Sequence, residues 1–155
     1  MEHQNLEQCK RRLRESGSRI TKGRLAVWKV LMGQGAPLSP VEIHERIEKD
    51  RLLTNIDPVS IYRILEAFLE LELVHKVGPM GGFVACSHVD CPKGLHILTR
   101  CSACLKIREW DAPQSLMAPM LWYLKEQKGF LPNGHLIEVD GQCLDCQKIS
   151  KDNCN

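Results

Sequence analysis

Long hydrophobic runs are missing from this sequence of 155 residues. No stretch of 18 or more apolar residues occurs, which excludes a transmembrane helix, and the N-terminal residues are polar where a secretory signal would carry an apolar segment. Internal repeats and low-complexity segments are also absent. We therefore expect a cytoplasmic protein, and its apolar content of 43% is enough for a packed core.

A large net charge is missing too, because the formal charge is only +2 at pH 7. The charges are unevenly distributed, however. Residues 1–30 carry eight Lys and Arg against three Glu, whereas residues 86–155 carry eight of each sign. The basic first segment fits a surface that contacts phosphates, and a solvated helix face accounts for it equally well.

Cysteine, by contrast, is plentiful. Seven of the eight cysteines lie after residue 85, and four of these form two C-x-x-C pairs. In a reducing cytoplasm this pattern indicates metal ligation before disulfides.

Apolar residues at helical spacing predict four helices in the first half of the chain. These helices cover 5–16, 22–32, 40–50 and 58–71. Helix-start signals support the last three, because each follows a polar N-cap and two have proline in the first turn. The predicted caps are Thr21, Ser39 and Asp57.

The fourth helix combines an apolar stripe with a polar face. Its expected buried residues are Ile61, Leu65, Phe68, Leu69 and Leu71, and its more exposed ones are Ser60, Tyr62, Arg63, Glu66 and Glu70. Two short β-prone runs at 73–86 flank a glycine-rich loop and predict a hairpin. Three helices followed by a hairpin make a winged helix-turn-helix, in which the 58–71 helix enters the major groove of DNA and the hairpin lies beside the backbone.

The second half of the chain changes to a pattern of strands. Its predicted elements are three strands and one helix, at 95–101, 105–111, 135–143 and 113–129. With cysteines at the turns, this half is a small α/β domain. The expected fold is therefore α+β, with a winged helix-turn-helix DNA-binding domain at 1–84, a hinge at 85–92 and a metal-binding dimerisation domain at 93–155.

The two C-x-x-C pairs give the strongest chemical signal. They consist of Cys101, Cys104, Cys143 and Cys146. Four sulfurs satisfy a tetrahedral Zn²⁺ and leave no open position for catalysis, so a metal here is structural and contributes on the order of 10 kcal/mol to folding. Unrelated buried cysteines or a thioredoxin-like redox pair are weaker alternatives, because neither pair follows a strand at the start of a helix in a βαβ unit.

A second, more dispersed set of ligand-type residues lies around the hinge. Its members are His75, Cys86, His96 and Glu109, with His88 or Cys91 as further candidates. Ligands drawn from both domains would close on an ion in only one mutual orientation of the domains, as a sensor requires. Each residue also has a simpler interpretation, since isolated histidines are mostly surface residues and Glu109 suits a solvated strand.

Several segments together resemble the ferric uptake regulator family over nearly the whole chain. They are RITKGR at 19–24, SIYR at 60–63, VHKV at 74–77, the paired C-x-x-C motifs and HLIEVDGQC at 135–143. The resemblance implies a homodimeric, metal-dependent repressor that binds double-stranded operator DNA, with no enzymatic activity and no small-molecule substrate. It also implies that the four paired cysteines are the structural zinc ligands.

Within this family the second set resembles the regulatory site of the zinc uptake regulator subgroup. That resemblance implies a second zinc ion per protomer, held by His75, Cys86, His96 and Glu109. The spacing from His96 to Cys101 departs from the subgroup's pattern, so His88 or Cys91 stays an alternative ligand. Iron-sensing members carry a His-rich cluster where this chain has only His96, and a thiolate ligand favours Zn²⁺ over the harder Fe²⁺.

The resemblance also assigns contacts with DNA. Tyr62 and Arg63 match the family's pair in the recognition helix, where Arg63 can bond a guanine edge and Tyr62 can pack on a thymine methyl or a phosphate. Packing of Tyr62 on the wing is an equal alternative. The other expected DNA-binding residues are Ser60, Arg24, Arg19 and Lys22, the last three at phosphates.

Other functions fit parts of this pattern. An iron- or peroxide-responsive repressor of the same family would use Cys86 or Cys91 for redox chemistry. A zinc-dependent hydrolase or deaminase is disfavoured, because the four-sulfur site is closed and no His-x-Glu motif pairs with a Pro-Cys-x-x-Cys segment. The sequence therefore predicts a zinc-responsive repressor of zinc uptake genes, with His3 and His135 as candidates for weak additional metal sites.

Overall fold

The computed structural model describes residues 2–33, 36–50, 55–78, 82–86, 96–132 and 136–152. The chain divides into two compact units, Met1–Asp90 and Cys91–Asn155. The division falls inside the segment 85–92, which is predicted to be a hinge and of which residues 87–92 lie outside the described residues.

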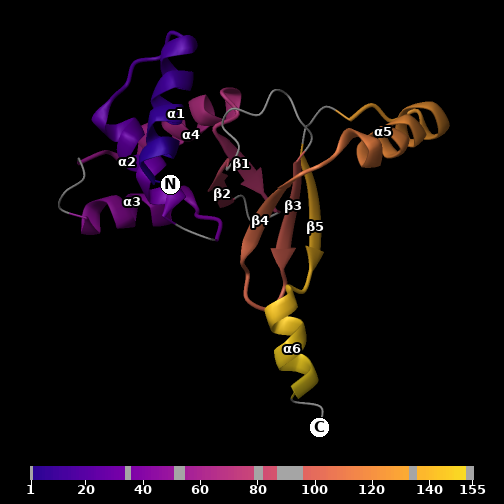
Figure 1. Cartoon of the computed structure of the whole chain (residues 1–155). Helices are drawn as coiled ribbons and strands as arrows, with labels where there is room; N and C mark the ends of the chain where they lie inside the picture. The colour runs from indigo at the N-terminus through magenta and orange to yellow at the C-terminus, as the bar shows by residue number, and fades with distance from the viewer. Residues whose placement is uncertain are drawn as a thin grey trace. The chain divides into compact units, whose positions relative to one another are not determined.

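The first unit is a winged helix-turn-helix, as the sequence predicts (Figure 1). Its helices are α1 (Glu2–Glu15), α2 (Lys22–Met32), α3 (Pro40–Lys49) and α4 (Pro58–Glu70). They are followed by an antiparallel hairpin of β1 (Val74–Val77) and β2 (Gly82–Ala85). Leu38 pairs with Phe83 of β2, which ties the segment before α3 to the hairpin.

The three predicted N-caps are all present. The side chains of Thr21, Ser39 and Asp57 accept hydrogen bonds from backbone N–H groups in the first turns of α2, α3 and α4. At α3 the bond is reciprocal, because the Glu42 carboxylate accepts from the backbone N–H of Ser39. Local capping chemistry thus fixes where each of these helices begins.

A single apolar core holds α4 in the first unit. The Phe68 ring packs edge-on against Trp28 of α2, with centroids 6.1 Å apart and planes at 87°. Ile64 is buried with this core, whereas Leu69 and Leu71 at the end of the predicted stripe are only half-buried. The buried face therefore lies nearer the start of α4 than the sequence indicates, which directs the opposite face of its first turns to solvent.

The second unit is built on a three-stranded sheet. Its strands are β3 (His96–Cys101), β4 (Ile107–Asp111) and β5 (Leu136–Gly141), in the order β4-β3-β5. β3 pairs antiparallel with β4 and parallel with β5. The segment between β4 and β5 carries α5 (Gln114–Trp122), which makes the long connection that parallel strands need.

Two features of the second unit differ from the predictions. The expected helix over 113–129 continues after α5 as a π-helical turn at Tyr123–Gln127. An additional helix that the sequence did not predict, α6 (Leu144–Asp152), follows β5. None of the described helices is long and apolar enough to cross a membrane.

One face of this sheet carries apolar side chains. Ile97 of β3 lies opposite Trp110 of β4 and Ile137 of β5, so the three side chains form a row across the sheet. Trp110 and Val139 are each 47% exposed. Further exposed apolar residues lie on α5 and the π-helical turn, namely Leu116, Met120, Trp122 and Tyr123. Such a collection of exposed apolar side chains in one small unit indicates a surface that another molecule covers.

Candidate metal centres and nucleic-acid interface

The four paired cysteines meet at one end of the sheet. Cys101 ends β3 and Cys104 follows in the turn, while Cys143 follows β5 and Cys146 lies in the first turn of α6. Parallel pairing places Cys101 opposite Gly141, two residues before Cys143. The β3–β5 register therefore brings the two C-x-x-C pairs together, although 38 residues separate them in sequence.

The geometry of this cluster suits a tetrahedral metal ion. All four sulfur atoms lie within 4.8 Å of one another, and the Sγ atoms of Cys104 and Cys143 are 3.8 Å apart. Zn–S bonds of about 2.3 Å at tetrahedral angles put two sulfurs about 3.8 Å apart. The side chains thus already have the spacing of zinc ligands, as the sequence predicts.

Hydrogen bonds make the four thiols chemically unequal. Backbone N–H groups of Cys143 and Cys104 lower the pKa of the Cys101 thiol to about 6, because they stabilise its thiolate. Hydrogen bonds to Cys143 and Cys104 raise the pKa of Cys146 to about 12. Cys101 therefore loses its proton before Cys146, and a metal cation that binds Cys146 must displace its proton, so metal affinity should increase with pH.

His75 and Cys86 form a pair of ligand-type side chains on the hairpin of the first unit. The N–H of Cys86 donates to the carbonyl of Leu73 (2.8 Å), and His75 pairs with Val84. This register puts His75 and Cys86 on the same face, one diagonal step apart. A ring nitrogen of His75 lies within 4.8 Å of Cys86 Sγ, and the two residues are only 4% and 3% exposed. One ion can reach both atoms.

His96 and Glu109 form a second pair, on β3 and β4 of the second unit. The Nδ1 of His96 lies 3.4 Å from Glu109 Oε1 and 3.6 Å from Asp111 Oδ1. Two such atoms bound to one Zn²⁺ at about 2.0–2.2 Å lie about 3.4 Å apart in tetrahedral geometry. Asp111 was not among the predicted ligands. The alternation of Glu109 and Asp111 on one face of β4 is the sequence signal that could have identified it.

Tyr62 and Arg63 lie on the solvent side of α4. Tyr62 is 51% exposed and Arg63 is exposed, while Ile61 and Ile64 beside them point into the core. Helical spacing therefore presents the two residues predicted to contact bases on one surface, at the N-terminal half of the predicted recognition helix.

The other residues predicted to contact DNA divide into two groups. Ser60 and Arg24 have local partners: Ser60 donates from its N–H and its hydroxyl to the Asp57 carboxylate, and Arg24 Nη1 donates to the carbonyl of Arg19 (2.7 Å). The side chains of Arg19 and Lys22 are exposed. Ser60 thus has a capping role at the start of α4 whether or not it contacts DNA.

Several candidate residues lie outside the described residues. These are His88, Cys91 and His135, together with the side chains of His3 and Cys154. Cys9 is described and is fully buried in the core of the first unit. Burial raises the pKa of its thiol to about 12, so Cys9 is a packing residue without a reactive thiolate.

Replacing Cys104 with serine should remove one metal ion per chain and unfold the second unit, because metal binding supplies on the order of 10 kcal/mol in small zinc domains. Elemental analysis of the purified chain and circular dichroism would measure the two effects. Cys9→Ala is the matched control and should keep the full metal content. A Cys104→Ser chain with unchanged metal content and spectrum would contradict the assignment.

Known proteins resemble this chain in sequence over almost its whole length. The model of the ferric uptake regulator family matches residues 15–139. The ferric uptake regulation protein of Campylobacter upsaliensis is 28% identical, over 94% of this chain and 91% of that protein. The peroxide-responsive repressor PerR of Staphylococcus saprophyticus is 31% identical over 95% and 94%, and the zinc uptake regulation protein of Escherichia coli is 24% identical over 93% and 82%.

Solved structures share the fold. A zinc uptake regulator complexed with zinc and DNA superimposes with a TM-score of 0.81 at 23% identity, covering 96% of this chain and 97% of that one. Members of the matching family are transcription regulators and not enzymes. The extent of the family match and the four-cysteine cluster lead to one conclusion: the chain belongs to the ferric uptake regulator family.

Proposed function

We propose that this regulator is a zinc-responsive repressor that binds a palindromic operator as a homodimer. The observation that carries the proposal is the presence of one preformed ligand pair in each unit, His75 with Cys86 and His96 with Glu109. Both pairs bind the same zinc ion in this proposal. The ion then joins the two units and fixes the orientation of the DNA-binding unit.

The types of donor atom favour zinc. Two imidazoles, a thiolate and a carboxylate form a mixed N, S and O set of four, which is common for Zn²⁺, and the thiolate of Cys86 disfavours the harder Fe²⁺. The cysteine cluster is closed by four sulfurs and has a structural role. Each protomer therefore binds two zinc ions, one in each kind of site.

Switching requires that the ion bind one orientation of the units more tightly than the others. A nearly complete shift between two populations needs a difference of about 5 kcal/mol in binding free energy. Ligands divided between two units can supply this difference, because only one orientation satisfies all four. The controlled genes are those for zinc acquisition, by resemblance to the zinc uptake regulator subgroup.

The names of the relatives support one alternative to a zinc-responsive repressor. They include ferric uptake regulation proteins and peroxide-responsive repressors as well as zinc uptake regulation proteins. In an iron- or peroxide-responsive repressor, the thiol of Cys86 would serve redox chemistry. Metal content and response to peroxide distinguish the two functions.

Cys86→Ala and Glu109→Gln should each remove one zinc ion per protomer and abolish the dependence of DNA affinity on free zinc, while the zinc of the cysteine cluster stays bound. Elemental analysis and a gel-shift titration in zinc buffers would measure both effects. His44→Ala changes a histidine that bonds the Ile56 carbonyl, away from both pairs, and should leave both readouts unchanged. Tight binding of iron, or a peroxide-dependent loss of DNA affinity, would support the alternative.

DNA recognition is proposed to involve α4. Arg63 reads a guanine edge, Tyr62 packs on a neighbouring thymine methyl or phosphate, and the exposed Arg19 and Lys22 bind phosphates.

Arg63→Ala should weaken binding to the operator by about 1–3 kcal/mol and relax the preference at a single base pair. Lys22→Ala should instead weaken binding to all sequences and reduce the slope of log affinity against log salt by about one. Fluorescence anisotropy on operator and scrambled duplexes at several salt concentrations would separate the effects. Equal losses on both duplexes for Arg63→Ala would remove it from base recognition.

Dimerisation is proposed to use the apolar sheet face of the second unit and the exposed residues of α5. Apolar side chains such as Trp110 and Val139 gain free energy when a second copy covers them. A two-fold dimer uses the same surface on both copies, which matches a palindromic operator.

Val139→Glu should convert the dimer into monomers, because it places a charge at the centre of an apolar contact. Sedimentation velocity would detect the change in mass. Val41→Glu is the control, because Val41 of the first unit is also exposed, at 58%. Dimers that survive Val139→Glu would show that another surface joins the copies.

A further inference from the structure

Val59 is an exposed apolar residue at the start of α4. It is the second residue of the helix, and its side chain is 59% exposed. Among the described residues, the apolar side chains that form or border the core of the first unit do not include Val59. A β-branched residue at an exposed helix position is also a poorer helix former than alanine. The folding of the first unit therefore does not account for a valine at this position.

Val59 lies on the same side of α4 as the two residues that are proposed to contact bases. Tyr62 and Arg63 follow it by three and four residues, so the three side chains are neighbours on the helix surface, and all three are exposed. The exposed residues that come next along α4, Glu66 and Glu70, are acidic and repel phosphates. The part of α4 that fits DNA is therefore its first two turns, which begin with Val59.

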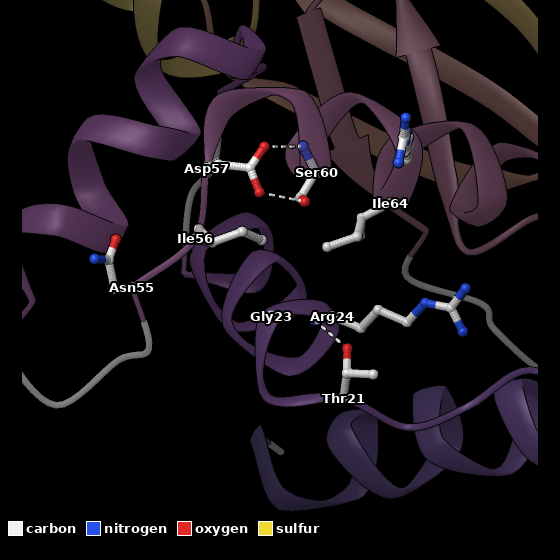
Figure 2. A pocket seen from close by; sticks show the side chains of 9 residues that line it. Thr21, Gly23, Arg24, Asn55, Ile56, Asp57, Ser60 and Ile64 are labelled. Carbon is white, nitrogen blue, oxygen red and sulfur yellow. Dashed lines mark hydrogen bonds between the residues drawn. The ribbon is translucent and has the colours of Figure 1, made fainter.

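The backbone at Val59 is held in place by the cap of α4. Figure 2 shows the Asp57 carboxylate accepting hydrogen bonds from the N–H and the hydroxyl of Ser60, the residue after Val59. Ile64, in the second turn, belongs to the buried core. A valine side chain in a helix has one strongly preferred χ1 rotamer. Val59 therefore presents its two methyl groups in a nearly fixed direction, and a contact with them costs little side-chain entropy.

We infer that Val59 contacts the C5-methyl group of a thymine in the major groove. The inference rests on the proposed DNA-binding function and adds a further base-reading residue to it. Thymine carries an apolar group on its major-groove edge, and apolar side chains recognise that group by contact. Val59 precedes Arg63 by about 6 Å along the helix axis, and successive base pairs are about 3.4 Å apart. The thymine therefore lies within about two base pairs of the guanine that Arg63 is proposed to bind.

The chemistry of valine gives this contact its selectivity. Tyr62 can contact a methyl group with its ring or a phosphate with its hydroxyl, whereas the side chain of Val59 has no polar atom. A cytosine at the same place would present its N4 amino group, and Val59 would exclude water from that donor without accepting its hydrogen bond. Val59 thus favours thymine and also disfavours cytosine.

The test removes single methyl groups from the DNA. A duplex is selected from a random pool by the zinc-loaded wild-type chain, and each thymine of one half-site is replaced in turn by uracil, which keeps the base pair and lacks the methyl. At one thymine within two base pairs of the position where Arg63→Ala relaxes the base preference, uracil should weaken binding by the wild-type chain about fourfold. In Val59→Ala the same replacement should have almost no effect, because the contact is already lost. Fluorescence anisotropy would measure the affinities.

Protein stability separates recognition from folding. Val59→Ala should bind the thymine duplex about fourfold more weakly without lowering the thermal unfolding temperature, because alanine is the better helix former. Val41 is the matched control, since it is also the second residue of a capped helix that begins with proline and is 58% exposed, but it lies on α3. Val41→Ala should leave the affinity and every effect of uracil unchanged.

Two outcomes would overturn the inference. In the first, Val59→Ala binds the thymine duplex as tightly as the wild-type chain does. In the second, the effects of uracil in Val59→Ala equal those in the wild-type chain at every position, so that any methyl contact belongs to another residue. If the wild-type chain selects no duplex from the pool, the proposed function itself fails, which is distinguishable from a chain that selects a duplex and whose uracil effects do not depend on Val59.

Discussion

The parallel register between β3 and β5 is the constraint on which the second unit depends. It places the C-terminal ends of β3 and β5 side by side, and so brings the four sulfurs of the cysteine cluster together. The same β3 begins at His96, five residues before Cys101, a separation of about 17 Å along a strand. A metal that holds one end of the sheet therefore also fixes the strands that present His96 and Glu109 at the other end. The cysteine cluster and the proposed sensing ligand His96 therefore share one strand.

A comparable connection exists in the first unit, between α4 and the hairpin. The chain turns sharply after α4, with Glu72 in the left-handed region at φ 55°, and the N–H of Leu73 returns to the carbonyl of Phe68. Leu73 and Val74 then join the same apolar core as Phe68. His75 directly follows Val74, so the core that supports α4 also fixes the position of His75. A ligand bound at the hairpin therefore contacts the same compact unit that carries the proposed DNA-reading side chains.

The sequence predicted those features that depend on neighbouring residues. Thr21, Ser39 and Asp57 marked the helix starts because a cap needs only the next turn, and the C-x-x-C pairs marked the metal cluster because two cysteines three apart share one ion. Helix α6 was missed because its polar sequence has no apolar stripe and its start depends on the Cys143–Cys146 turn. Asp111 was missed because its contact with His96 depends on strand register.

The close packing at Gly23 of α2 was likewise invisible in the sequence. It depends on Ile56 and Ile64, which approach α2 from a different part of the chain and leave a Cβ at Gly23 only 3.0 Å from Ile56 Cδ1. The two ligand pairs form an intermediate case. Residue types suggested all four members, while only the register of each sheet explains why His75 lies near Cys86 and His96 near Glu109.

The uncovered sheet face has a consequence for how the regulator responds in a cell. If a second copy covers Trp110 and Val139, assembly and folding become linked by mass action, and dilution opposes both. A cell with few copies of the protein would then contain a smaller fraction of dimers at any given zinc concentration. For the proposed zinc-responsive repressor, the zinc concentration needed for repression would depend on the copy number of the protein as well as on the affinity of its ligands.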